Sequence, residues 1–201
     1  MAAPTTTTSL RFKLILLGDF GVGKTTFFHR IRTGHFLEEA HTLGQHMNVC
    51  ERMLPLRHSR SNRQAQISLW DTAGEERFLS LSSCYFRNAD AVLLVYSLQA
   101  LISFDSLSHW VYVARQYCAD ADIFLLGNKS DLENRVSEDK AEKFAVEHCA
   151  SERFKVSAKT GENVERSLQE MVEHLFLKKE FQRSSLQVPL QDVGYYSHCG
   201  C

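Results

Sequence analysis

The sequence has almost no net charge, because 23 lysine and arginine residues face 24 aspartate and glutamate residues, leaving a formal charge of -1 at pH 7. Nucleic acids are bound largely through their phosphates, and such binding needs concentrated positive charge. The balance therefore argues against DNA or RNA as a partner. With 201 residues, 44% of them hydrophobic, the chain is long enough for one well-buried domain and does not require two.

Long hydrophobic runs are also missing. A membrane-spanning helix needs about 20 consecutive apolar residues, and no run in the sequence approaches that length. The N-terminal stretch MAAPTTTTSLRFK lacks the apolar core that signal peptides carry. We therefore expect a protein that is made in the cytosol and stays there unless it is anchored.

The six cysteines do not form a metal-binding pattern. Cys50, Cys84, Cys118 and Cys149 are scattered without the paired spacing of a zinc site, as is typical of reduced thiols in a cytosolic protein. Two further cysteines lie within the last three residues. These two are either idle thiols on a frayed end or a modification signal, and the rest of the chain has to decide between these readings.

Short apolar runs alternate with segments of helical period. We expect strands at 12–17, 67–70, 91–96, 123–126 and 154–156. Two helical faces are expected from apolar spacing, the first from Phe104, Leu107, Val111 and Ala114, the second from Val164, Leu168, Met171, Val172 and Leu175. Ser137, followed by two acids, has the form of a helix N-cap.

This alternation predicts right-handed βαβ units, which build a mostly parallel sheet with helices on both faces. Ligands of such sheets bind at the carboxyl ends of the strands. The expected organisation is a disordered leader at 1–9, one domain at 10–181 and a flexible tail at 182–201.

The segment GDFGVGKT, Gly18 to Thr25, directly follows the first expected strand and fits the pattern GxxxxGK[ST]. Its glycines let backbone N–H groups curl around phosphate oxygens, Lys24 neutralises their charge, and the hydroxyl of Thr25 is available to Mg²⁺. The plain alternative is a glycine-rich turn that joins a strand to a helix.

Two further motifs also follow expected strands. Asp71, in LWDTAGEERF, supplies the acid that such a site needs near a metal. In NKSD, the carboxylate of Asp131 can accept both N–H donors of a guanine edge, whereas adenine lacks that pair and would leave the carboxylate unpaired. Asn128 and Lys129 would brace the loop and cover the base. Each motif alone is an ordinary polar turn, but three in order at strand ends favour a guanine nucleotide site.

Taken together, GDFGVGKT, WDTAGEERF, GNKSD and VSAKT resemble the nucleotide-binding motifs of Ras-superfamily small GTPases. The stretches QISLW, RFLSLS, YFRNA and LVYSLQ resemble those that mark the Rab branch. The resemblance implies an α/β P-loop NTPase fold with a mostly parallel six-stranded sheet and helices on both faces. It also implies a GTP-binding switch that regulates vesicle trafficking and protein transport by recruiting effectors in its GTP state.

The resemblance further implies roles for particular residues. Thr25 and Thr42 would bind Mg²⁺, and Asp71 would reach the metal through water. The backbone of Ser157 to Lys159 would close over guanine, and Phe36 would stack beside it, unless Phe36 is a core aromatic. The implied nucleotide-binding set is Gly21, Val22, Gly23, Lys24, Thr25, Thr26, Phe36, Thr42, Asp71, Gly74, Asn128, Lys129, Asp131, Ser157, Ala158 and Lys159.

Two residues depart from the family near the reacting phosphate. After DTAG the family usually has a glutamine that positions the attacking water, and here the residue is Glu75. An ionised glutamate can only accept hydrogen bonds, and two unit charges about 4 Å apart at an effective dielectric near 20 repel by roughly 4 kcal/mol. Phe20 fills a position where the family tolerates only small residues. We therefore expect slow GTP hydrolysis, with Glu75, Lys24 and Thr42 nearest to the reaction.

Two other departures concern recognition. The stretch from Phe36 to Thr42 is one residue shorter than the usual spacing in the family. The segment LRHSRSNRQ, Leu56 to Gln64, is longer and more basic than is usual. We interpret it as a solvated hairpin insertion, and the alternative is a surface that faces phosphoinositides or a partner.

The ending CGC resembles a Rab prenylation signal and implies two geranylgeranyl groups, on Cys199 and Cys201. Two lipids matter because one gives only marginal membrane binding. The implied location is the cytoplasmic face of an intracellular membrane, with a cytosolic pool. The implied partners are effectors, an exchange factor, a GTPase-activating protein, a prenylation escort and a GDP-dissociation inhibitor, all acting on a monomer.

Two functions remain open at this stage. The protein is either a cycling GTPase or a largely GTP-locked platform for effectors. A P-loop ATPase or nucleotide kinase is a third reading, against which Asp131 and the lack of a second lid segment argue.

Overall fold

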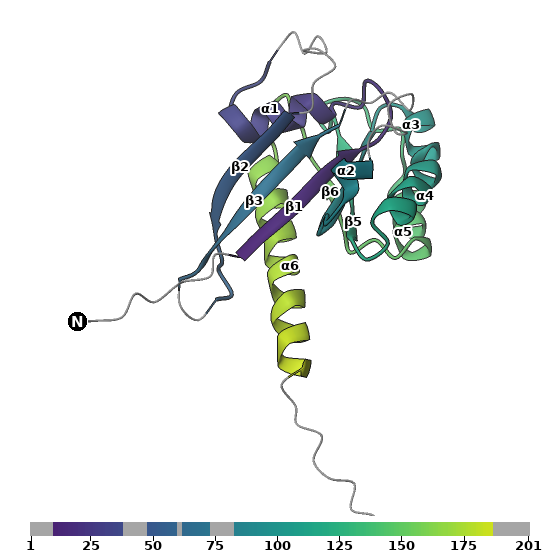
Figure 1. Ribbon diagram of the computed structural model, residues 1–201. Coiled ribbons are helices and arrows are strands. Elements are labelled where there is room, and N and C mark those ends of the chain that lie inside the picture. Colours follow the sequence, from purple (N-terminus) through teal and green to yellow (C-terminus); the bar gives the residue numbers. More distant parts are fainter. Residues whose placement is uncertain (1–9, 38–47, 60–61, 73–82, 187–201) are drawn as a thin grey trace, which may run out of the picture.

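A computed structural model describes residues 10–37, 48–59, 62–72 and 83–186. Its six strands form one sheet in the order β2-β3-β1-β4-β5-β6 (Figure 1). The strands are β1 Leu10–Leu17, β2 Asn48–Pro55, β3 Gln64–Asp71, β4 Ala91–Ser97, β5 Asp122–Asn128 and β6 Glu152–Lys155. Neighbouring strands are parallel except for β2, which runs antiparallel to β3. The expected α/β fold with a mostly parallel six-stranded sheet is therefore confirmed.

Helices cover both faces of this sheet (Figure 1). They are α1 Lys24–Thr33, α2 Ser83–Phe86, α3 Leu101–Asp105, α4 Leu107–Tyr117, α5 Glu138–Glu147 and α6 Val164–Leu186. One buried cluster joins α1 and α6 to the sheet, and a second joins α3, α4 and α5 to its other face. Of the described helices, none combines the length and apolar character that a bilayer crossing requires.

The strands explain why the core forms where it does. β4 is buried at every position, as expected for a strand covered on both faces. β3 pairs with β1 from Leu10↔Ala65 to Leu16↔Asp71, which brings Asp71 next to the end of β1. Ligands of open α/β sheets bind where strand order reverses, and here β3 and β4 flank β1 on opposite sides.

Several local expectations differ from the structure. The expected strand at 154–156 is β6 at Glu152–Lys155, and β2 was not among the strands expected from apolar runs. The helical face of Phe104, Leu107, Val111 and Ala114 is buried as expected, but α3 and α4 divide it. The α6 helix runs to Leu186, beyond the residue 181 at which the domain was expected to end.

The basic turn between β2 and β3 packs onto α6. The carboxylate of Glu173, which is 6% exposed, accepts hydrogen bonds from the backbone N–H groups of Arg57 at 2.5 Å and His58 at 3.4 Å. Arg63 forms an ion pair with Glu180 at 3.2 Å. The described part of the insertion is thus attached to the domain rather than free in solvent.

Candidate functional site

A cavity of about 420 Å³ lies at the carboxyl ends of β1 and β5. Its volume is in the usual range for small-molecule sites. The described residues that line it are Phe20, Gly21, Gly23, Lys24, Thr25, Thr26, Phe36, Asn128, Lys129, Asp131, Leu132, Ala158 and Lys159. The residues after β1, the residues after β5 and the loop after β6 therefore meet at one place.

The loop from Gly18 to Gly23 depends on glycine at its two ends. A Cβ on Gly18, whose φ is 144°, would lie 2.1 Å from the carbonyl oxygen of Val95 in β4. A Cβ on Gly23, whose φ is 98°, would lie 2.3 Å from Nδ2 of Asn128. Both backbone conformations are ones that side chains disfavour. The two glycines thus let the loop lie directly against β4 and against Asn128 of the NKSD motif.

The first turn of α1 presents backbone N–H groups to this loop. Gly23 is the N-cap residue, and its lack of a side chain leaves α1 without a side-chain cap. Such N–H groups, together with the helix dipole, bind anions. The loop and the helix start can therefore hold phosphate oxygens.

Two buried charged groups, Lys24 and Asp71, lie beside the loop that follows β1. The Nζ of Lys24 donates to the carbonyl oxygens of Gly18 and Asp19, each at 2.7 Å. Burial lowers the pKa of Lys24 to about 8, although Asp71 and Asp19 favour its charged form. Burial likewise raises the pKa of Asp71 to about 6, against the hydrogen bond from Thr25 and the charge of Lys24. Both groups lack the full solvation that their charges need.

Asp71 fits the requirements of a Mg²⁺ site. Its Oδ1 is buried and has no hydrogen-bond partner among the described residues, while its carboxylate accepts from the Thr25 hydroxyl. Mg²⁺ takes oxygen ligands and is usually held by one or two protein groups together with substrate phosphates and water. No group of three or more His, Cys, Asp or Glu side chains in the described segments is arranged so that it could hold a metal ion. A metal here would therefore depend on Thr25, Asp71 and a bound phosphate.

Asn128 joins the two halves of the cavity. It is 2% exposed at the end of β5. Its Nδ2 donates to the carbonyl oxygen of Val22 at 2.9 Å, and its Oδ1 accepts from the N–H of Ala158 at 3.0 Å. One amide thus ties the loop after β1 to the loop after β6.

The neighbouring residues of the NKSD motif are held as well. Lys129, at φ 67°, donates from Nζ to the carbonyl oxygen of Gly21 at 2.7 Å. The hydroxyl of Ser157, which is fully buried, donates to Oδ1 of Asp131 at 2.5 Å and accepts from the N–H of Thr160. These contacts orient the Asp131 carboxylate at the cavity wall.

Arg30 of α1 also holds the loop after β6. Its Nε donates to the carbonyl oxygen of Ala158 at 2.9 Å, and one of its terminal nitrogens donates to that of Lys159. The other terminal nitrogen donates to Gly34 at 2.8 Å, just past the end of α1. A single guanidinium therefore links the loop to the segment that leads to Phe36.

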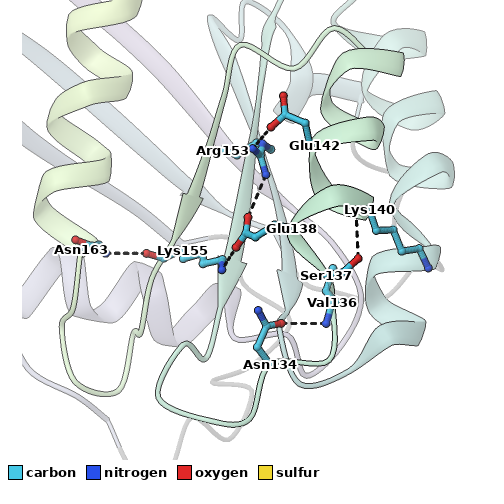
Figure 2. A network of polar contacts seen from close by, with 9 residues as sticks. All are labelled: Asn134, Val136, Ser137, Glu138, Lys140, Glu142, Arg153, Lys155 and Asn163. Atoms are coloured by element: carbon cyan, nitrogen blue, oxygen red, sulfur yellow. Dashed lines mark hydrogen bonds and ion pairs between the residues drawn. The ribbon is translucent and has the colours of Figure 1, made fainter.

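The strand that precedes this loop is braced from outside the sheet. Figure 2 shows ion pairs from Arg153 and Lys155 of β6 to Glu138 of α5, and a second one from Arg153 to Glu142. Ser137 caps the N-terminus of α5, and its hydroxyl accepts from the N–H of Lys140, which confirms the expected N-cap. This network holds an edge strand that is short and rich in charge.

The structure brings together most of the expected site residues. Val22 and Ser157 lie buried beneath the lining, and Asp71 lies beside Thr25. Phe36 is 36% exposed and lines the cavity, so its ring is not part of the buried core. Thr42, Gly74, Glu75, Cys199 and Cys201 lie outside the described residues.

Sequence reasoning missed two contributors to the site. Arg30 contacts Ala158 and Lys159, which follow it by 128 and 129 positions in the sequence. The indole of Trp110 in α4 donates to Oδ1 of Asp19, which precedes it by 91 positions. No local pattern marks either residue, because each contact depends on how distant elements pack.

A glycine-rich loop between β1 and α1, beside an acid that ends the neighbouring strand, defines the P-loop class of nucleotide-binding α/β folds. Comparisons with known proteins narrow this class. The model of the Ras family matches residues 13–177. The chain is 35% identical over 190 residues to Ras-related protein Rab-27B of Homo sapiens. The aligned region covers 88% of this chain and 85% of that protein.

Other relatives agree. Ras-related protein Rab-19 of Xenopus laevis is 33% identical over 174 residues, covering 85% of this chain and 79% of its own. Ras-related protein Rab-18 of Caenorhabditis elegans is 31% identical over 198 residues, covering 94% of each chain. The chain therefore belongs to the Ras family of small GTPases. Within that family it is a Rab-like GTP-binding switch.

Proposed function

We propose that the chain binds GTP and GDP in the cavity described above and regulates vesicle trafficking as a membrane-anchored Rab-type switch. The observation that carries the proposal is the Asn128 amide, which joins the P-loop to the loop at Ala158 across one cavity. Phosphate and base sites are thereby held at a fixed separation, as a nucleotide requires.

Guanine is recognised by the residues that follow β5 and β6. Asp131, oriented by Ser157, accepts from the two N–H donors of the guanine edge. Lys129 and Phe36 cover the faces of the base, and the backbone at Ala158 and Lys159 closes its rim. The phosphates lie against the P-loop backbone, including Gly21, Val22 and Gly23, and against the first residues of α1 up to Thr26.

An Asp131→Asn variant tests this assignment. An asparagine offers a donor where the carboxylate only accepts, so it cannot accept from both guanine N–H groups. Xanthine carries an oxygen where guanine carries its amino group, so it suits the asparagine better. We expect GDP to bind at least about a hundredfold more weakly and xanthosine diphosphate to gain affinity. Unchanged GDP affinity would contradict the proposed base site, and ATP competition as strong as GTP in the wild type would support a P-loop ATPase instead.

Mg²⁺ is the proposed cofactor. Thr25 supplies its hydroxyl and Asp71 acts through water, since the buried Oδ1 of Asp71 lacks a partner among the described residues. Thr42 is proposed as a third contributor from the sequence alone. When bound, the ion neutralises the charge on the terminal phosphates.

Hydrolysis is proposed to be slow. Glu75 replaces the residue that would position water, and its charge is repelled by the phosphates. Phe20 is 71% exposed and lines the cavity, which supports an obstruction where an activating protein would insert an arginine. If turnover is slow enough, the protein acts as a long-lived GTP-bound platform rather than a cycling enzyme.

Single-turnover phosphate release from the GTP- and Mg²⁺-loaded protein tests this, with Glu75→Gln beside the wild type. A slow wild type that the glutamine accelerates by about tenfold or more supports the role of Glu75. Family-like rates in both proteins would contradict slow hydrolysis. If both proteins hydrolyse GTP equally slowly, the slow rate would be attributed to Phe20, and the Phe20→Ser variant then tests that attribution.

Membrane attachment is proposed to require two prenyl groups, on Cys199 and Cys201, and to place the protein on the cytoplasmic face of an intracellular membrane with a cytosolic pool. Effectors, an exchange factor, an activating protein, a prenylation escort and a GDP-dissociation inhibitor are the proposed partners. Replacing both cysteines with serine should move the protein from the membrane fraction to the soluble fraction. Continued fractionation with membranes would show that the anchor lies elsewhere.

A further inference from the structure

Asp19 places a negatively charged side chain beside the proposed phosphate site. It is the second residue of the P-loop, and its backbone carbonyl accepts from Nζ of Lys24 at 2.7 Å. Its side chain carries the same sign of charge as the ligand, so a carboxylate that turned toward the phosphates would oppose their binding. The loop therefore needs a means of keeping this carboxylate away from the ligand.

Trp110 of α4 supplies that means. Its indole Nε1 donates to Oδ1 of Asp19 at 2.7 Å, and the side chain is 2% exposed. An indole can only donate, and a hydrogen bond to a carboxylate is stronger than one between neutral groups. The described residues that line the cavity include Phe20 and Gly21 but not Asp19, so the carboxylate faces α4 instead of the ligand site.

We propose that Trp110 is a positioning residue of the nucleotide site, which holds the Asp19 carboxylate away from the phosphates and so sets the affinity for the triphosphate. This inference rests on the proposed function, because it assumes that phosphates occupy the P-loop. It links α4, a helix that does not line the cavity, to the strength of nucleotide binding.

A purely structural role for the same hydrogen bond makes a different prediction. If the bond only satisfied a buried indole N–H, losing it would loosen the loop whatever the charge at position 19. If the bond restrains a charge, losing it should matter only while that charge is present. The charge at Asp19 therefore separates the two roles.

The experiment is a double-mutant cycle on the full chain, with Trp110→Phe, Asp19→Asn and the double variant. Affinities for GDP and for a non-hydrolysable GTP analogue are measured by displacement of a fluorescent nucleotide, together with melting temperatures. Phenylalanine keeps an aromatic ring but has no donor. We expect Trp110→Phe to weaken the GTP analogue by roughly tenfold and GDP by less, because GTP carries one more negative charge.

The double variant should match Asp19→Asn, because Trp110 has no charge to restrain once residue 19 is neutral. If Trp110→Phe weakens binding equally in the wild type and in Asp19→Asn, or if it changes nothing in the wild type, the proposal is overturned. If Trp110→Phe fails to fold, Asp19→Glu serves as the test in its place. This variant keeps Trp110 and the negative charge but carries the charge on a longer side chain, so it should also weaken GTP binding. Wild-type affinity in that variant would overturn the proposal as well. A wild type that binds neither nucleotide would instead refute the proposed function.

Discussion

The two halves of the cavity are built differently. In the base half, Asn128, Lys129 and Asp131 each hold a hydrogen bond to another part of the protein. In the phosphate half, Lys24 contacts carbonyl oxygens of its own loop, and Oδ1 of Asp71 has no hydrogen-bond partner among the described residues. This difference fits the proposed function, in which the protein itself completes the base half, whereas a ligand and a metal would complete the phosphate half.

The charges of the phosphate half show what this arrangement costs. Burial lowers the pKa of Lys24 and raises that of Asp71, so each charged form is poorly solvated. Phosphates and Mg²⁺ would supply the missing opposite charges. Binding should therefore stabilise the fold as well as occupy the site, since a ligand that binds the native state raises its stability.

The largest effect is expected where the two halves are joined. Asn128→Ala leaves the carbonyl of Val22 and the N–H of Ala158 without their partners, at about 1–3 kcal/mol each. Nucleotide affinity should therefore fall roughly a hundredfold or more. Fluorescent GDP displacement measures it, with Asn134→Ala as the matched control, because Asn134 contacts only the nearby N–H of Val136 in the described network. Equal losses in the two variants would show that the bridge is unimportant.

Removing Mg²⁺ should affect the phosphate half alone. Chelation is expected to speed GDP release by roughly tenfold or more, because the terminal phosphates lose their counter-charge. Asp71→Asn should remove most of this sensitivity to chelation. Guanosine, which has no phosphates, should bind equally well with and without the metal in an equilibrium assay. Metal dependence of guanosine binding would contradict the division between the halves.

A smaller effect is expected from the brace behind the base half. Arg30→Gln loses most of the hydrogen bonds to Ala158, Lys159 and Gly34, so GDP should dissociate about three- to tenfold faster, as measured by stopped-flow release. Arg32→Gln on the exposed side of α1 is the control and should leave the rate unchanged. If both variants release GDP at the wild-type rate, the brace does not limit dissociation.

The smallest effect on nucleotide binding is expected far from the cavity, at Glu173. Burial alone would raise the pKa of Glu173, but hydrogen bonds from Arg57, His58 and Gln169 outweigh it and lower the pKa below 4.5. A lowered pKa means that the carboxylate stabilises the fold above pH 4.5 and that this stabilisation is lost as the pH falls through the lowered value.

Glu173→Gln should therefore lower the free energy of unfolding by about 1–3 kcal/mol at pH 7. The difference from the wild type should shrink as the pH falls below 4.5, and GDP release should stay unchanged. Urea denaturation at pH 7 and pH 4 measures the difference in the free energy of unfolding, and stopped-flow fluorescence measures GDP release. A difference that grows in acid would show that the sign of the pKa shift is wrong.

Much of the fold could be predicted because its signals are local. The P-loop, the buried strands and the cap at Ser137 each depend on neighbouring residues. β2 escaped prediction because the exposed Glu51, the partly exposed Arg52 and Pro55 interrupt its apolar pattern, while its pairing with β3 stabilises it. The break between α3 and α4 is hidden because buried positions on both sides of it keep one helical period.

The contacts that control the site were harder to predict. Arg30 and Trp110 act on loops that lie far away in the sequence, and neither belongs to a motif. The charged residues of β6 are stable at a sheet edge because α5 supplies Glu138 and Glu142 as partners. Such pairings follow from how helices pack on a sheet, which spacing along the chain does not encode.

The length of α6 separates two tasks in space. The helix begins at Val164, just after the loop that lines the cavity, and continues past the strands to Leu186 (Figure 1). With 23 residues it is about 35 Å long. The cavity lies near the start of this helix, and the described chain ends at its other end. The helix is thus a spacer, and two proteins that contact its two ends need not collide.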